Sequence, residues 1–136
     1  MITVSREILD EVITLAQEYK KLCFAYEDKF FPDSYVFGAD EFEESTEYTN
    51  MKNAENELFE YISNLDYESI KDLKTLMYLG RDCEYEQYYG MERFDMCRKF
   101  WDEMGWNDNK MIEVENIAEK LPLGEYLIKG KEYIGW

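Results

Sequence analysis

Apolar residues recur at helical spacing near the start of the chain. Between residues 5 and 26 they return at alternating steps of three and four, which places them on one face of a helix. The positions are Ile8, Val12, Leu15, Tyr19, Leu22 and Tyr26. Ser5 precedes this run and can cap the first turn, and Glu7 lies near the positive end of the helix dipole. The pattern predicts a long amphipathic helix over residues 5–26.

The same periodicity continues over most of the remaining chain. It predicts further helices at residues 51–64, 67–79, 84–104, 110–121 and 122–134. Asp66 is a capping residue for the third helix, and we expect Gly80 to end that helix in a left-handed conformation. Gly90 weakens the middle of the fourth helix, and Pro122 suits the first turn of the sixth. The expected fold is therefore all-α or mostly α, a compact bundle of five to six helices.

Residues 27–50 break this pattern with a concentration of acidic side chains. Eight Asp and Glu face a single lysine there, so the segment carries −7. Pro32 and Gly38 interrupt any helix. Six aromatic residues lie among the acids, and a solvated linker would not need them. We expect a long acidic, aromatic-rich loop that packs in part against the helices, with a candidate short strand or hairpin at residues 34–37.

The composition is that of a folded chain despite its acidity. Hydrophobic residues make up 46% and aromatic residues 17%, whereas disordered acidic tails are poor in aromatics. We expect one domain over residues 1–136. No stretch approaches the roughly 18 apolar residues of a membrane helix, and residues 1–6 begin no signal peptide. The three cysteines have no paired spacing, which is typical of reduced thiols in a cytoplasmic protein.

The net charge and the absence of histidine narrow the possible functions most. The chain has 31 Asp and Glu, 15 Lys and Arg and no histidine, for a formal charge of −16. Histidine is the side chain most used for acid–base catalysis and metal ligation near neutral pH. No Ser-His-Asp set, P-loop or Gly-x-Gly-x-x-Gly motif occurs. We expect a non-enzymatic protein with no catalytic residues and no cofactor. Direct nucleic-acid binding is disfavoured, because phosphate contacts need clustered Lys and Arg.

Two stretches of the chain carry recognisable motifs. Residues 56–82 include the run Leu-Met-Tyr-Leu-Gly-Arg, and residues 121–130 read Leu-Pro-Leu-Gly-Glu-Tyr-Leu-Ile-Lys-Gly. Both resemble a bacterial domain-of-unknown-function family of small helical proteins, in which Trp tends to stand at the position of Tyr78. The resemblance implies a compact helical fold and no assigned activity.

One alternative is a magnesium-dependent enzyme. Residues 43–47 fit the pattern Glu-Glu-x-x-Glu, and two more acids follow about twenty residues later. All-α nucleotide pyrophosphohydrolases use a similar carboxylate set to hold Mg²⁺ against a triphosphate, without histidine. The ligands would be Glu43, Glu44, Glu47, Glu68 and Asp72. Ser45 and Thr46 are poor spacers within a helix, and so acidic a chain produces chance matches.

The leading interpretation is a binding protein that uses carboxylates against a basic surface of a partner protein, such as a nucleic-acid-processing enzyme. Charge would be concentrated on one negative face, with aromatic residues supplying desolvated contacts. The candidate contact residues are Asp40, Glu41, Glu43, Glu44, Glu47 and Tyr48, with Glu84 and Glu86 as a second patch. Phage-encoded anti-CRISPR inhibitors share this acidic character. The remaining alternative is an adaptor of the helical family, in which the charge serves solubility. The oligomeric state stays open.

Overall fold

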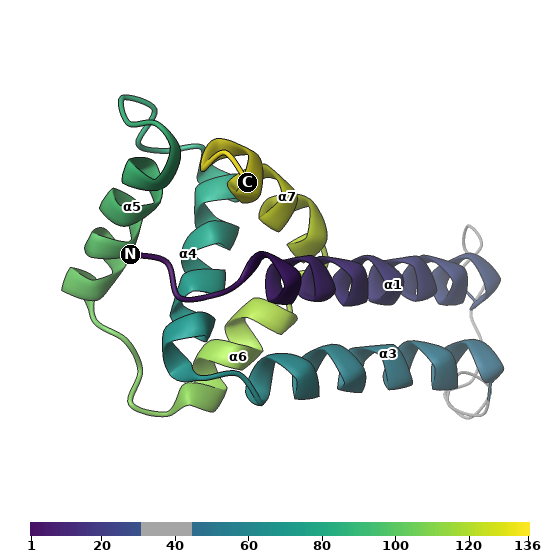
Figure 1. Cartoon of the computed structure of the whole chain (residues 1–136). Helices are drawn as coiled ribbons and strands as arrows, with labels where there is room; N and C mark the ends of the chain where they lie inside the picture. Colours follow the sequence, from purple (N-terminus) through teal and green to yellow (C-terminus); the bar gives the residue numbers. More distant parts are fainter. Residues whose placement is uncertain (31–44) are drawn as a thin grey trace.

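A computed structural model describes residues 1–30 and 45–136 of the chain (Figure 1). This part contains six helices and no strand, which confirms the expected all-α bundle. The helices are α1 (Arg6–Phe30), α3 (Thr46–Ser63), α4 (Tyr67–Asp82), α5 (Gly90–Met104), α6 (Lys110–Ala118) and α7 (Leu123–Tyr133). The candidate strand at residues 34–37 lies outside the described residues.

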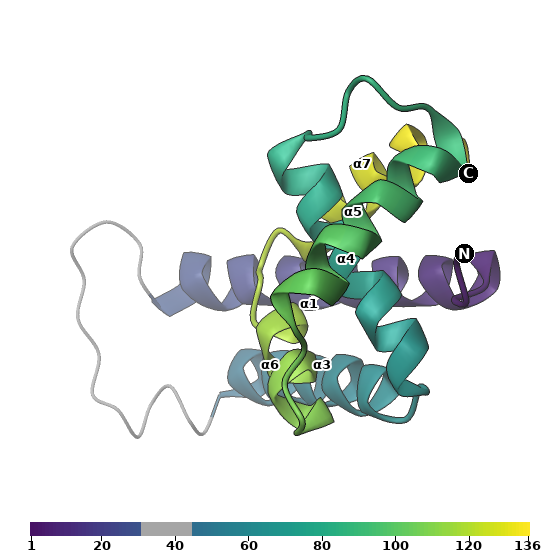
Figure 2. The ribbon, with the colours of Figure 1, turned by 90° about the vertical axis from the view of Figure 1, so that its left-hand side faces the viewer.

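The helices α1 and α3 lie side by side and antiparallel, and they project from the rest of the molecule (Figures 1 and 2). Three cross-helix contacts set their register. The Tyr19 hydroxyl donates to Glu55 at 2.9 Å, and the Tyr26 and Tyr48 rings are 5.8 Å apart. The third contact joins Lys29 to Glu47. The helix α4 lies at the centre of the remaining helices and contacts α5, α6 and α7.

The expected loop over residues 27–50 is wrong at both ends, because α1 continues to Phe30 and α3 begins at Thr46. The physical reason lies in the contacts that the two helix ends make. Both Glu47 oxygens accept hydrogen bonds from Lys29 at 2.9 Å, and Ser45 caps α3 by accepting the Tyr48 amide at 3.0 Å. These polar contacts extend the helices beyond the apolar stripe that predicted them.

The predicted end of the third helix is also wrong. Gly80 lies inside α4, which continues to Asp82, and Cys83 supplies the left-handed cap with φ 56°. The predicted start of the next helix fails for a related reason, since α5 begins only at Gly90. Tyr85 is also left-handed, with φ 61°, so helical backbone cannot run through this segment. The cap of α4 at Asp66 and the cap of α1 at Ser5 are confirmed.

The smaller differences lie near the C-terminus. The helix α6 ends at Ala118 rather than at residue 121, and α7 begins just after Pro122. The core joins all six helices through fully buried side chains, which include Leu9, Leu58, Ile70, Leu76, Phe94, Ile117 and Leu127. None of the described helices combines the length and the apolar content needed to cross a membrane.

Gly80 instead allows the backbones of α4 and α7 to touch. A Cβ atom placed on Gly80 would lie 1.8 Å from the Tyr126 carbonyl oxygen, and one on Gly130 would lie 2.3 Å from the Leu76 oxygen. The two backbones can approach this closely only because glycine has no side chain. The two sequence stretches at residues 56–82 and 121–130 therefore pack directly against each other.

This crossing predicts a large effect from one methyl group. Gly80→Ala should lower the free energy of unfolding by about 3 kcal/mol or more, because α7 must move away from α4. Urea denaturation followed by circular dichroism measures the effect. Gly124→Ala on α7 is the matched control, because its Cβ would lie 2.8 Å from the Gln17 Cγ but 3.7 Å from the nearest backbone atom, so its loss should be smaller than that of Gly80→Ala. Equal losses in the two variants would contradict the close crossing.

Candidate functional site

Most of the basic side chains in the described residues pair with acidic side chains of the same chain. All 15 Lys and Arg lie in residues 1–30 and 45–136, together with 26 of the 31 acids. Nine of those basic side chains form ion pairs: Lys20, Lys29, Lys52, Lys71, Lys74, Arg81, Arg98, Lys120 and Lys131. Many carboxylates are therefore left facing solvent.

These exposed carboxylates occupy several surfaces. On α1 they follow the helical repeat of its outer face, at Glu7, Glu11 and Glu18. Others lie on α3, at Glu57 and Glu60. None of these five forms an ion pair with a described residue. The acidic surface is therefore broader than the two patches that the sequence singled out.

The segment of residues 83–89, between α4 and α5, presents a compact acidic surface. Glu84 and Glu86 are exposed there and form no ion pair with a described residue. Tyr89 is 84% exposed, which is unusual for a large aromatic side chain. The buried Arg93 holds the backbone in place, because its guanidinium donates to the carbonyl oxygens of Cys83 at 3.2 Å and Glu84 at 3.0 Å.

Glu47 and Tyr48 have a different environment. The Lys29 hydrogen bonds lower the pKa of Glu47, and Tyr48 packs on Tyr26. Both residues lie at the far end of the α1–α3 pair, whereas residues 83–89 lie at the opposite end of the molecule in both views (Figures 1 and 2). The described members of the predicted site thus form two surfaces rather than one face. The predicted contact residues Asp40, Glu41, Glu43 and Glu44 lie outside the described residues.

The carboxylates of the magnesium alternative are also separated. The Arg98 guanidinium donates to Asp72 and Glu68 at 2.6 Å and to Asp102 at 2.9 Å. Glu47 lies in the first turn of α3, and that helix rises about 25 Å before the chain enters α4, which holds Glu68 and Asp72. Within residues 1–30 and 45–136, no group of three Cys, Asp or Glu side chains is arranged to hold a metal ion. Glu43 and Glu44 lie outside the described part.

Asp72 connects three parts of the fold. Its fully buried carboxylate accepts the amides of Thr3 at 2.6 Å and Val4 at 3.0 Å, in addition to Arg98 of α5. Burial raises the pKa of Asp72, and these three donors oppose the rise. Asp72 therefore fastens the N-terminal segment and α5 to α4. Its spacing from Glu68 suggested a ligand pair, but no pattern in the sequence indicated Arg98 as their partner.

Removing the Arg98 charge should destabilise the protein. Arg98→Met leaves Asp72 buried without its cation, which we expect to cost about 3 kcal/mol. Urea denaturation at neutral pH measures this loss, with Lys99→Met as the control, because Lys99 is exposed and forms no ion pair with a described residue. The difference in unfolding free energy between the two variants should narrow near pH 4. Burial raises the pKa of Asp72, and protonation there neutralises the carboxylate that Arg98→Met leaves without a cation. A loss equal to that of Lys99→Met would contradict the assigned role.

Comparisons of the chain with protein families, curated proteins and solved structures found no match. The acidic segment beside Tyr89 combines exposed carboxylates that form no ion pair with a described residue and an exposed aromatic side chain.

Proposed function

We propose that this protein is a non-enzymatic binding module that contacts a basic surface of a partner protein. One observation carries the proposal: Glu84 and Glu86 face solvent and form no ion pair with a described residue, close in sequence to Tyr89, which is 84% exposed. Protein interfaces combine an aromatic anchor with polar and charged groups at the rim. The acids at residues 40–44 are proposed as a second contact region.

The way in which Arg93 holds this segment favours binding. A surface that is ordered before the partner arrives loses less conformational entropy on association. Arg93 also lies over the Tyr133 ring at 4.0 Å, so it joins the segment to α7 as well as to α5. Cys83 adds a contact of 3.0 Å between its sulfur and the Tyr133 hydroxyl. The carboxylates are thereby presented on a supported backbone.

The mechanism of such a module is competition for cations. Carboxylates that pair with Lys and Arg of the partner occupy the groups that would otherwise bind phosphate, so nucleic acid is displaced. The net charge of −16 also speeds the encounter with a basic surface. We propose a nucleic-acid-processing enzyme as the partner and inhibition as the result, in the manner of anti-CRISPR proteins. The adaptor role is the rival proposal.

Salt and charge substitution test this proposal. The partner is captured from the source cell and identified by mass spectrometry, and its dissociation constant is then measured from about 50 to 200 mM salt. We expect binding to weaken steeply with salt, because screening acts on exposed charges. Glu84→Gln with Glu86→Gln, or Tyr89→Ala alone, should weaken binding about tenfold, and nucleic acid should compete.

Glu7→Gln with Glu11→Gln is the matched control, since it removes the same charge from the outer face of α1. It should change the affinity by less than about threefold. Binding that does not depend on salt, or equal weakening by the two double variants, would show that the 83–89 segment is not the contact surface.

A further inference from the structure

A pocket of about 210 Å³ lies between α4, α5 and the 83–89 segment that joins them (Figure 2). Four aromatic side chains line it: Tyr78 from α4, Tyr85 from the segment, and Phe100 and Trp101 from α5. Its volume is below the range of sites for drug-sized molecules and suits one long side chain. Because Glu84 and Tyr85 belong to the segment, the pocket is continuous with the proposed contact surface.

The backbone fixes the position of Tyr85 at the edge of this pocket. Its left-handed conformation, with φ 61°, is strained for an aromatic residue. Hydrogen bonds hold it on both sides, because Arg93 donates to the Glu84 carbonyl and the Tyr88 amide donates to the Tyr85 carbonyl, both at 3.0 Å. The wall that Tyr85 forms is therefore in place before a ligand arrives.

The charged residues of the lining leave a negative charge without a partner. The Arg81 guanidinium donates to both oxygens of Asp82, at 2.8 and 3.2 Å, so this pair is neutral. Glu84 also lines the pocket and forms no ion pair with a described residue. The pocket thus combines aromatic rings with one carboxylate that a ligand can use.

Two other groups of the lining respond to this charge. Burial raises the pKa of the Cys97 thiol to about 12, and Glu84 is the next largest cause, with Asp82 adding to the rise. Burial also raises the pKa of Tyr85, to which the charges of Glu84 and Glu103 contribute. The negative potential that opposes the loss of a proton from these groups favours a positively charged ligand.

One wall of the pocket already holds a guanidinium group. Arg81 lies over the Tyr78 ring at 4.4 Å while it pairs with Asp82. Among the described residues, the cation–π contacts do not include the rings of Tyr85 or Phe100. Phe100 is also 42% exposed. These two rings are therefore accessible to a cation from outside the chain.

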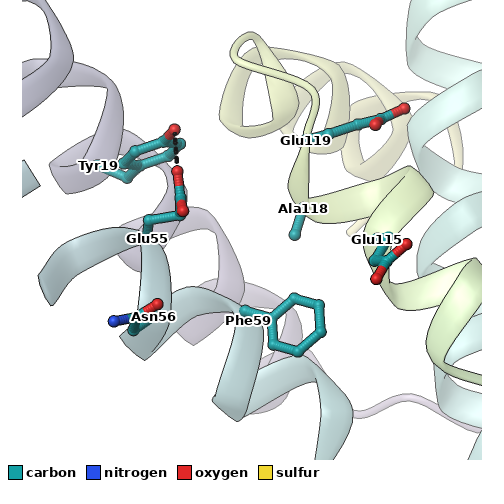
Figure 3. A pocket seen from close by; sticks show the side chains of 7 residues that line it. All are labelled: Tyr19, Glu55, Asn56, Phe59, Glu115, Ala118 and Glu119. Atoms are coloured by element: carbon teal, nitrogen blue, oxygen red, sulfur yellow. Dashed lines mark hydrogen bonds between the residues drawn. The ribbon is translucent and has the colours of Figure 1, made fainter. Parts of the chain in front are cut away.

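A larger cavity of about 430 Å³, between α1, α3 and α6, lacks this combination (Figure 3). The two Glu55 oxygens there accept hydrogen bonds from Lys52 at 2.8 Å and Tyr19 at 2.9 Å. Figure 3 shows the carboxyl groups of Glu115 and Glu119 turned away from Glu55. The negative charge of that cavity does not converge on a single ligand.

We infer that the pocket between α4, α5 and the 83–89 segment receives an arginine side chain from the basic surface of the partner protein. The guanidinium packs on the rings of Tyr85 and Phe100 and pairs with Glu84. Arginine fits better than lysine, because its planar group stacks on aromatic faces and donates several hydrogen bonds in one plane. This inference rests on the proposed function and names the group that the partner inserts.

Amide NMR of the ¹⁵N-labelled protein tests the pocket, with Nα-acetyl-arginine amide as the probe and the ionic strength held at about 150 mM. We expect saturable shifts at the lining residues. The corresponding citrulline amide has nearly the same shape without the charge and should bind at least about tenfold more weakly. The lysine amide keeps the charge but lacks the planar group and should bind at least about threefold more weakly.

Two pairs of variants connect the probe to the pocket. Phe100→Ala removes a wall and should weaken arginine binding about fivefold, whereas Met104→Ala, one turn further along α5 and also exposed, should stay within about twofold. Glu84→Gln should weaken it about tenfold, whereas Glu86→Gln, which does not line the pocket, should stay within about twofold. Circular dichroism confirms that each variant is folded.

The probe needs no partner, so the two proposals can fail separately. The arginine inference is overturned if the arginine amide gives no saturable shifts, if citrulline or lysine binds as tightly, or if the two members of either variant pair behave alike. The proposed function stands in that case if partner binding still weakens with salt. Arginine binding as expected, together with partner binding that ignores salt, would overturn the proposed function alone.

Discussion

The direct contact between the backbones of α4 and α7 is the constraint on which the rest of the structure depends. The helix α4 is buried along most of its length and touches three other helices, so its position fixes theirs. A side chain at Gly80 or Gly130 would separate α4 from α7. Because α1 also packs on α7, the projecting α1–α3 pair takes its direction from the same crossing.

Buried and exposed carboxylates are treated differently in this fold. The buried carboxylates of Asp72 and Glu113 each have a cation, from Arg98 and Lys74 respectively. Many of the exposed carboxylates form no ion pair with a described residue, among them Glu7, Glu57 and Glu84, so the excess charge lies where water screens it. Lys74 also lies over the Trp101 ring at 5.1 Å, so one side chain joins the acidic core position of α6 to the aromatic residues of α5.

Much of the fold follows from the sequence, but the site follows only in part. Apolar spacing located all six helices, because burial of one face dominates helix stability in proteins. Apolar spacing did not predict the last turn of α1 or the first turn of α3, because both depend on the hydrogen bonds between Lys29 and Glu47. It placed the end of α4 at Gly80, because a glycine that permits helix contact and one that caps a helix look alike in sequence. The aromatic pocket and the Arg98 network join residues of different helices, which single-sequence patterns do not reveal.

Under the proposed binding role, the separation between Glu47 and the 83–89 segment sets a geometric limit on the partner. The helix α1 alone has 25 residues, or about 37 Å of helical rise, and the end of the α1–α3 pair that holds Glu47 lies opposite the 83–89 segment. A large partner that meets both ends gains avidity, since the second contact becomes intramolecular. A small partner can contact only one end, which leaves the other end free to bind a second molecule of the partner. Under the same proposal, the stoichiometry of a complex would therefore report the size of the partner's basic surface.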